Sequence, residues 1–124
     1  TGVNAHQYWL LDVGSAEAVR ALKPDRASVM QLALPGIIVT GAGDGLYDFT
    51  SRFFAPADGI FEDPVTGSAH AALAPYWQSV LGKDQFLAFQ ASPRGGSLEV
   101  RVAGERVLIG GKTVVVARGE LLVP

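Results

Sequence analysis

Residues 68–81 constrain the fold of this chain more than any other part of the sequence, because they form its one long stretch of helical character. The apolar residues of this stretch fall on every side of the helical wheel, and many of them are alanine. A helix that is apolar all round is typically buried, and small side chains let a surrounding sheet approach its axis. Pro75 removes one backbone donor inside the stretch, so we expect a kink or a restart there.

Two short helices are predicted in the first third of the chain. Ser15 and Asp25 each stand at a candidate N-cap position, where a short polar side chain accepts a hydrogen bond from a first-turn amide. Pro24 stops the first helix and Pro35 stops the second. The expected helices cover residues 17–22 and 25–33.

Strands account for most of the remaining chain. Compact apolar, aromatic or β-branched runs favour strands before the long helix, and alternation of apolar with polar residues favours half-buried strands after it. The glycine-rich residues 41–45 are interpreted as a hairpin loop, because a strand follows them and a nucleotide-binding loop would be followed by a helix. The expected strands are residues 8–13, 36–40, 48–55, 98–102, 106–109 and 113–117. The sequence therefore predicts one α+β domain over residues 1–124, with an antiparallel-rich sheet curled around one buried helix.

Composition argues against several classes of function. The net charge is −2, with ten basic and twelve acidic residues spread along the chain, which leaves no basic stripe for a nucleic-acid partner. The chain has no cysteine, and its two histidines, His6 and His70, share no metal-ligand spacing, so no metal is expected. No apolar run reaches the ~18 residues of a membrane span, and no signal peptide opens the chain. We therefore expect a cytoplasmic domain without a membrane partner.

The segment that enters the long helix carries the candidate chemistry. Asp63 precedes a turn, and Thr66, Gly67 and Ser68 then open the helix. Gly67 has no Cβ, and the first-turn amides with the helix macrodipole favour an anion such as a substrate carboxylate. Asp63 and Ser68 are five residues apart, so both can face this anion site. An acid, a hydroxyl and an anion cradle together predict a proton-transfer site, with Asp63 and Ser68 catalytic and Thr66, Gly67 and Ser68 binding substrate.

The same residue types have a simpler structural use, which the sequence alone leaves open. Asp63 or Thr66 can cap the helix, and Ser68 can satisfy a first-turn amide, since capping is the commoner use of such residues. His70 is interpreted as a structural histidine inside the buried helix rather than a ligand contact.

Residues 53–77, FFAPADGIFEDPVTGSAHAALAPYW, resemble the signature of PhzF-like (phenazine-biosynthesis-type) isomerases, within the diaminopimelate epimerase fold. Residues 90–96, QASPRGG, and residues 119–121 are similar to that family's C-terminal end, so the resemblance covers nearly the whole chain from about Tyr8. The resemblance implies the C-terminal half of a two-domain protein, in which each half is an antiparallel-rich mixed sheet curled into a barrel-like shell around a central helix. It also implies that two helix N-termini point at one substrate between the halves.

The activity implied by the resemblance is isomerisation or epimerisation of a small carboxylate-bearing metabolite by acid–base proton transfer, without a cofactor. Asp63 and Ser68 match the site residues of the family's C-terminal half, and Gly67 matches the cradle. The family's catalytic glutamate and its partnering histidine belong to the other half, and neither Glu17 nor Glu62 matches that glutamate.

This departure predicts a chain that is incomplete without a second half, supplied by a missing N-terminal half or by a second copy in a homodimer. The alternative is a stand-alone homodimeric domain that binds a small anionic metabolite, or another partner, without catalysis. Arg52 and Arg94 are further candidates for a substrate carboxylate, although a solvated or carboxylate-paired arginine is commoner.

Overall fold

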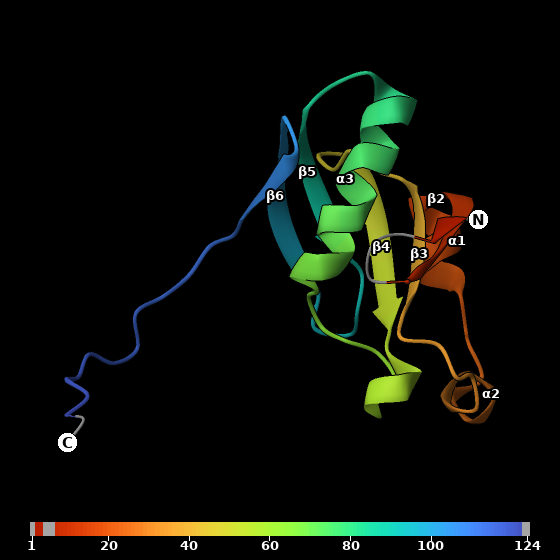
Figure 1. The fold of residues 1–124 in the computed structure, drawn as a ribbon. Helices are drawn as coiled ribbons and strands as arrows, with labels where there is room; N and C mark the ends of the chain where they lie inside the picture. Colours follow the sequence, from red (N-terminus) through yellow and green to blue (C-terminus); the bar gives the residue numbers. More distant parts are fainter. Residues whose placement is uncertain (1, 4–6, 123–124) are drawn as a thin grey trace.

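The computed structural model describes residues 2–3 and 7–122, which form one mixed sheet with helices packed on it (Figure 1). His6 lies outside the described residues. The sheet has seven strands in chain order, and the pairs β2–β3 and β4–β5 are parallel while the other four are antiparallel. The strands are β1 (Gly2–Val3), β2 (Trp9–Ser15), β3 (Ile37–Ala42), β4 (Phe49–Phe54), β5 (Gln85–Gln90), β6 (Gly96–Ala103) and β7 (Arg106–Gly110). The predicted α+β class and antiparallel-rich sheet are therefore confirmed.

The helices connect the parallel strand pairs, because a parallel pair needs a crossover connection. Ser15 Oγ accepts a hydrogen bond of 3.1 Å from the Ala18 amide, and the Asp25 carboxylate accepts one of 2.8 Å from the Ser28 amide, so both predicted N-caps are confirmed. The second helix ends earlier than expected, and the long helix runs through Pro75 without a break. The helices are α1 (Ala16–Ala21), α2 (Arg26–Met30), the 3-10 turn η1 (Pro56–Asp58) and α3 (Gly67–Leu81).

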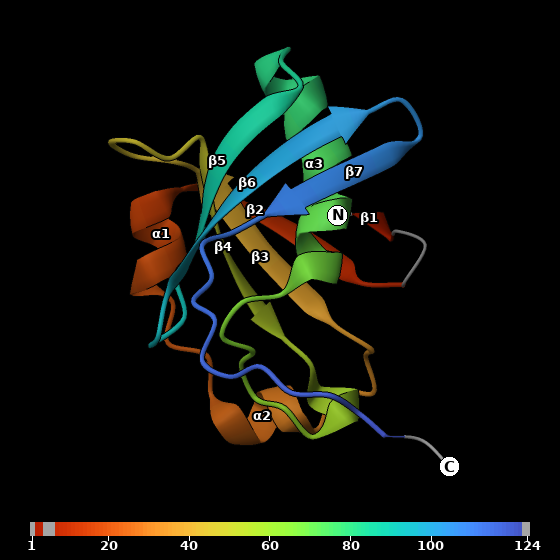
Figure 2. The ribbon, with the colours of Figure 1, turned by 90° about the vertical axis from the view of Figure 1, so that its left-hand side faces the viewer.

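Helices cover both faces of the first half of the sheet (Figures 1 and 2). Along β3, Ile38 faces α3 and joins the main core, while Ile37 and Val39 face α1 and join a second, smaller core. In the main core, Phe49 of β4 stacks on Trp77 of α3, with ring centroids 5.5 Å apart. The crossover between β4 and β5 thus fixes α3 on one face of the sheet, with its first turn just after the loop that leaves β4.

The expected barrel-like shell is not seen, because the described sheet stays open with β1 and β7 at its edges. The prediction that α3 is buried all round is wrong for the described chain. The side that carries Leu73, Ala74 and Trp77 is buried, whereas Pro75 is exposed and Val80 is 52% exposed. A sheet that covers one side of a helix leaves the opposite side to solvent, whatever the apolar pattern.

The predicted strand at residues 113–117 is also wrong. Residues 111–122 form no secondary structure and extend away from the sheet (Figure 1). Val114 is 84% exposed and Val116 is 91% exposed. β-Branched residues favour a strand only where a neighbouring strand supplies hydrogen bonds, and the described chain supplies none here.

The glycine-rich residues 41–45 lie in the hairpin between β3 and β4, as predicted. The Gly43 amide donates to the Asp48 carbonyl at 2.9 Å across the hairpin. A Cβ on Gly41 would lie 2.5 Å from the Ser15 carbonyl oxygen, and one on Gly43 would lie 2.0 Å from the Tyr47 carbonyl oxygen. These glycines are needed for close backbone packing.

Across the described part of the chain, no helix combines the length and hydropathy needed to cross a membrane.

Candidate functional site

The loop that carries Asp63 is anchored to β4 at two consecutive residues. The Asp63 amide donates to the Phe53 carbonyl at 2.9 Å. Next to it, Glu62 pairs with Arg52 of β4 through two hydrogen bonds of 2.7 and 2.9 Å, and the Arg52 side chain also donates to the Leu22 carbonyl at 2.7 Å. The side chains of Arg52 and Glu62 are only 10% and 7% exposed. Arg52 therefore holds the loop in place and is not available to a substrate carboxylate, and Glu62 is not a free base.

No side chain in the described part of the chain caps the first turn of α3. Thr66 is the N-cap residue, but its hydroxyl donates to the Asp63 carboxylate and accepts nothing from the helix amides. Among the described residues neither side chain caps α3, so the capping alternative is wrong for Asp63 and Thr66. Gly67 is exposed, and a Cβ built on it would meet no atom within 4 Å. The described residues thus leave open space beside Gly67 at the start of α3, and a helix start favours an anion.

Ser68 completes the group of sequence-predicted residues at this helix start. Its hydroxyl lies 3.2 Å from the hydroxyl of Tyr8, which comes from the segment before β2. Tyr8 in turn packs edge-on against Phe53, with ring centroids 5.0 Å apart. Ser68 is therefore held by a residue that sequence reasoning did not single out.

A network of buried polar side chains is hydrogen-bonded to the loop that carries Asp63. Gln90, the last residue of β5, is fully buried and contacts both Asp63 and Thr66. Ser92 donates to the Pro64 carbonyl at 2.8 Å. Sequence reasoning missed both residues. The alternation along β5 indicates that Gln90 is buried, because it is in phase with the buried Phe86 and Ala88. A polar side chain that is buried in this way must be hydrogen-bonded.

His70 belongs to the same network. It is fully buried, and its Nδ1 donates to the Thr66 carbonyl at 2.8 Å, which leaves Nε2 facing the Ser51 hydroxyl at 3.5 Å. Its ring stacks against Phe49, with centroids 5.9 Å apart. Burial lowers the pKa of His70, while the hydrogen bond to Thr66 acts in the opposite direction. His70 is thus a neutral structural histidine, as interpreted from the sequence.

Acidification from about pH 7 to about pH 5.5 is expected to destabilise the fold through His70. The folded-state pKa is lowered from 6.5, so the unfolded chain takes up the proton first. The stabilisation is complete above the unfolded pKa and is lost as the pH falls below it, by at most about 1.4 kcal/mol per pH unit. Urea unfolding at the two pH values measures this loss. His70→Gln keeps a hydrogen-bond donor but does not titrate, so it should reduce the change in the free energy of unfolding between the two pH values. An unchanged difference would contradict the assignment of this effect to His70.

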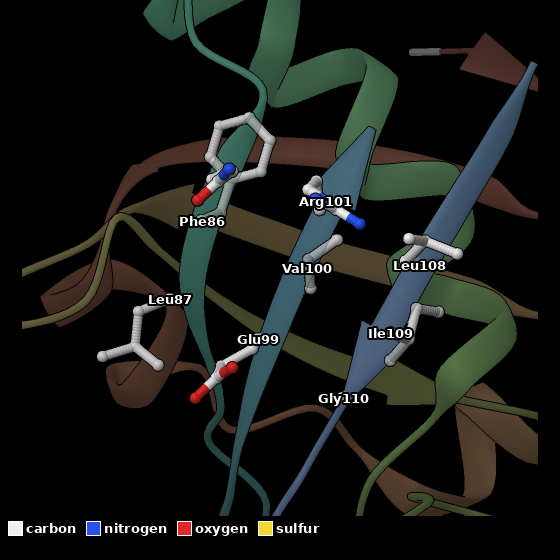
Figure 3. Close-up of a pocket in the computed structure, with 9 residues that line it drawn as sticks. Phe86, Leu87, Glu99, Val100, Arg101, Leu108, Ile109 and Gly110 are labelled. Atoms are coloured by element: carbon white, nitrogen blue, oxygen red, sulfur yellow. The ribbon is translucent and has the colours of Figure 1, made fainter. Parts of the chain in front are cut away.

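The hollow shown in Figure 3 lies away from these residues. It has a volume of about 710 Å³, lies over β5, β6 and β7, and carries Glu99 and Arg101 as its charged side chains. A second hollow of about 630 Å³ is lined by the exposed Arg94 and by Val65, which neighbours the candidate loop. Within the described chain Arg94 makes no ion pair, so it remains available to an anion beside the loop.

Comparison with known sequences identifies relatives across nearly the whole chain. A sequence model of the phenazine biosynthesis-like protein family, PhzC-PhzF, matches residues 2–119. An uncharacterized isomerase from Halalkalibacterium halodurans is 47% identical over 122 residues, covering 98% of this chain and 46% of the relative. A phenazine biosynthesis-like domain-containing protein from Homo sapiens is 41% identical over 122 residues, covering 90% of this chain and 42% of the relative.

Solved structures match the same region. A PhzF-family phenazine biosynthesis protein from Enterococcus faecalis superposes with a TM-score of 0.80 at 43% identity, over 92% of this chain and 44% of that one. A putative PhzC/PhzF protein from Clostridium difficile gives a TM-score of 0.80 at 37% identity, over 94% of this chain and 45% of that one. The chain therefore spans less than half the length of these relatives.

Proposed function

This chain belongs to the phenazine biosynthesis-like (PhzC-PhzF) family, and from that membership we propose that it contributes one side of an isomerase-type active site. The substrate is a small carboxylate-bearing metabolite. Its carboxylate binds the first turn of α3, and Asp63 and Ser68 act in acid–base proton transfer on the neighbouring carbon. The second acid–base group comes from another half.

The observation that carries this proposal is the start of α3, for which the described residues provide no side-chain cap. Helix N-termini are normally satisfied by a capping side chain, water or a ligand. Here the cap residue Thr66 donates its hydroxyl proton to the Asp63 carboxylate, and no side chain of the described residues caps the first-turn amides. This arrangement suits a substrate that brings one negative charge to the amides and one transferable proton to Asp63.

Gly67→Ala tests the binding part of the proposal. The free energy of unfolding should stay constant or rise by up to about 1 kcal/mol, because alanine is a better helix former and its Cβ meets nothing in the protein. The Kd for succinate should rise at least about tenfold, because the methyl group occupies the space where the ligand approaches the amides. Isothermal titration calorimetry measures the affinity.

Gly119→Ala is the matched control, because its Cβ also meets no atom within 4 Å and the residue lies far along the chain from α3. It should bind succinate like the unmodified chain. Equal succinate affinity in all three proteins would contradict the placement of the substrate at Gly67.

A second half is the proposed partner, either a missing N-terminal half or a second copy of this chain. Three features of the described chain support an interface: the open sheet edge at β7, the solvent-facing side of α3, and the exposed apolar residues Val114 and Val116. Unpaired sheet edges and exposed apolar segments are templates for pairing. We propose that a barrel-like shell closes on α3 only when this second half is in place.

The homodimer version of this proposal predicts that the pure chain sediments as a dimer at micromolar concentration, since two-fold contacts are the commonest oligomer symmetry. Replacing Val114 and Val116 with lysine should shift the population to monomer. A monomer for the unmodified chain would rule out the homodimer and leave the N-terminal half as the partner.

A further inference from the structure

Gln90 occupies a position that the strand pattern assigns to the core. It ends β5 in phase with Phe86 and Ala88, and it pairs in parallel register with Ser51 of β4. The side chain is fully buried. A buried amide at a core position is costly unless every polar atom has a partner, so its contacts reveal why a polar residue is kept there.

Within the described residues, the hydrogen bonds of the Gln90 side chain all go to the candidate loop. Its Oε1 accepts a hydrogen bond of 2.8 Å from the Thr66 amide. Its Nε2 donates to the Asp63 carbonyl at 2.7 Å and to the Thr66 hydroxyl at 3.1 Å. These partners fix the orientation of the amide, because a backbone amide can only donate and a carbonyl can only accept.

The orientation of Gln90 determines the direction of the next hydrogen bond. Since the Thr66 hydroxyl accepts from Gln90 Nε2, its own proton points to Oδ2 of Asp63. Oδ1 of Asp63 has no partner in the described part of the chain. One carboxylate oxygen is therefore anchored and the other is left for a substrate.

We infer that Gln90 is a positioning residue, which orients the Asp63 carboxylate through Thr66 and fixes the backbone that begins α3. This inference rests on the proposed function, because it assigns Gln90 to the same site. Glutamate at this position keeps the acceptor for the Thr66 amide but, when ionised, offers no donor to the Asp63 carbonyl. A protonated glutamate restores one donor, so the effect of Gln90→Glu on anion binding should depend on pH. If Gln90 merely filled space, the effect of the substitution would not depend on pH.

The test compares sulfate binding by the unmodified chain, Gln90→Glu, Gln90→Met and Thr40→Val, followed through the backbone amide signals of residues 66–69. Sulfate keeps its charge between about pH 5 and pH 9. Asp63 and His70 are the titratable groups of the network, so the unmodified chain is measured at both pH values as the reference. Thr40→Val is the matched control, because it removes a buried hydroxyl that bonds Trp77 in the second half of α3, away from the loop.

We expect Gln90→Glu to bind sulfate within about twofold of the unmodified chain at pH 5 and at least about tenfold more weakly at pH 9. Gln90→Met should bind sulfate weakly at both pH values, and Thr40→Val should bind it as the unmodified chain does at both pH values. If Gln90→Met fails to fold, Gln90→Glu carries the test. Binding by Gln90→Glu equal to the unmodified chain at both pH values would overturn the role of Gln90 and leave the proposed site intact. Absence of any sulfate response at residues 66–69 in the unmodified chain would overturn the proposed site, and this inference with it.

Discussion

Glu62→Ala is expected to lower the free energy of unfolding by about 3–5 kcal/mol, because it leaves the guanidinium of Arg52 buried without its carboxylate. Both side chains are at most 10% exposed, and the pair has bidentate geometry with distances of 2.7 and 2.9 Å. The remaining bond from Arg52 to the Leu22 carbonyl cannot neutralise the charge. Urea unfolding monitored by tryptophan fluorescence measures the loss.

Two further variants show whether the loss of stability comes from burying an unpaired charge or from losing an ion pair. Asp44→Ala breaks the Arg20–Asp44 pair, which is also bidentate but has side chains 40% and 58% exposed, so it should cause a much smaller loss. The double variant Arg52→Met with Glu62→Leu removes both charges and should recover most of the loss of Glu62→Ala. A Glu62→Ala protein as stable as Asp44→Ala would contradict the structural role of the pair.

The second large effect concerns activity. The chain alone is expected to exchange the acidic C–H proton of small carboxylate metabolites with heavy water about 10²–10⁴-fold more slowly than a full-length relative, because the proposed function assigns the second acid–base group to another half. The full-length isomerase from Halalkalibacterium halodurans, of which this chain covers 46%, is a suitable reference. Deuterium incorporation is measured by mass spectrometry over a panel of such metabolites.

Asp63→Asn provides the control for this measurement. Exchange by the chain alone at the rate of the reference, lost in Asp63→Asn, would show that no second half is needed. If metabolites bind but no exchange occurs after a second half is added, the stand-alone binding domain becomes the better account.

Features with local causes could be predicted from the sequence. The caps at Ser15 and Asp25 depend on residues three positions away, and the structure confirms both. The turn before the long helix predicts its start to within one residue, at Ser68, and the helix begins at Gly67. The resemblance of residues 53–77 pointed to the family, which the comparisons then showed.

Features that depend on distant parts of the chain could not be predicted. The β-branched residues at 113–117 have strand propensity but no neighbouring strand in the described chain, so they stay exposed. The side of α3 that carries Pro75 is exposed because the sheet covers only the opposite side. Gln90 reaches the loop across a separation of 24 residues from Thr66, and no local pattern in the sequence joins the two.

The measurement that tests the central claim most directly is a titration of the isotope-labelled chain with succinate, followed by backbone amide chemical shifts. We propose that the ligand carboxylate binds at the first turn of α3, which no side chain of residues 7–122 caps. We expect the largest shifts at Thr66, Gly67, Ser68 and Ala69, with smaller shifts at Asp63. Shifts confined to the hollow over β5–β7 or to residues 111–122, with none at the start of α3, would contradict the account.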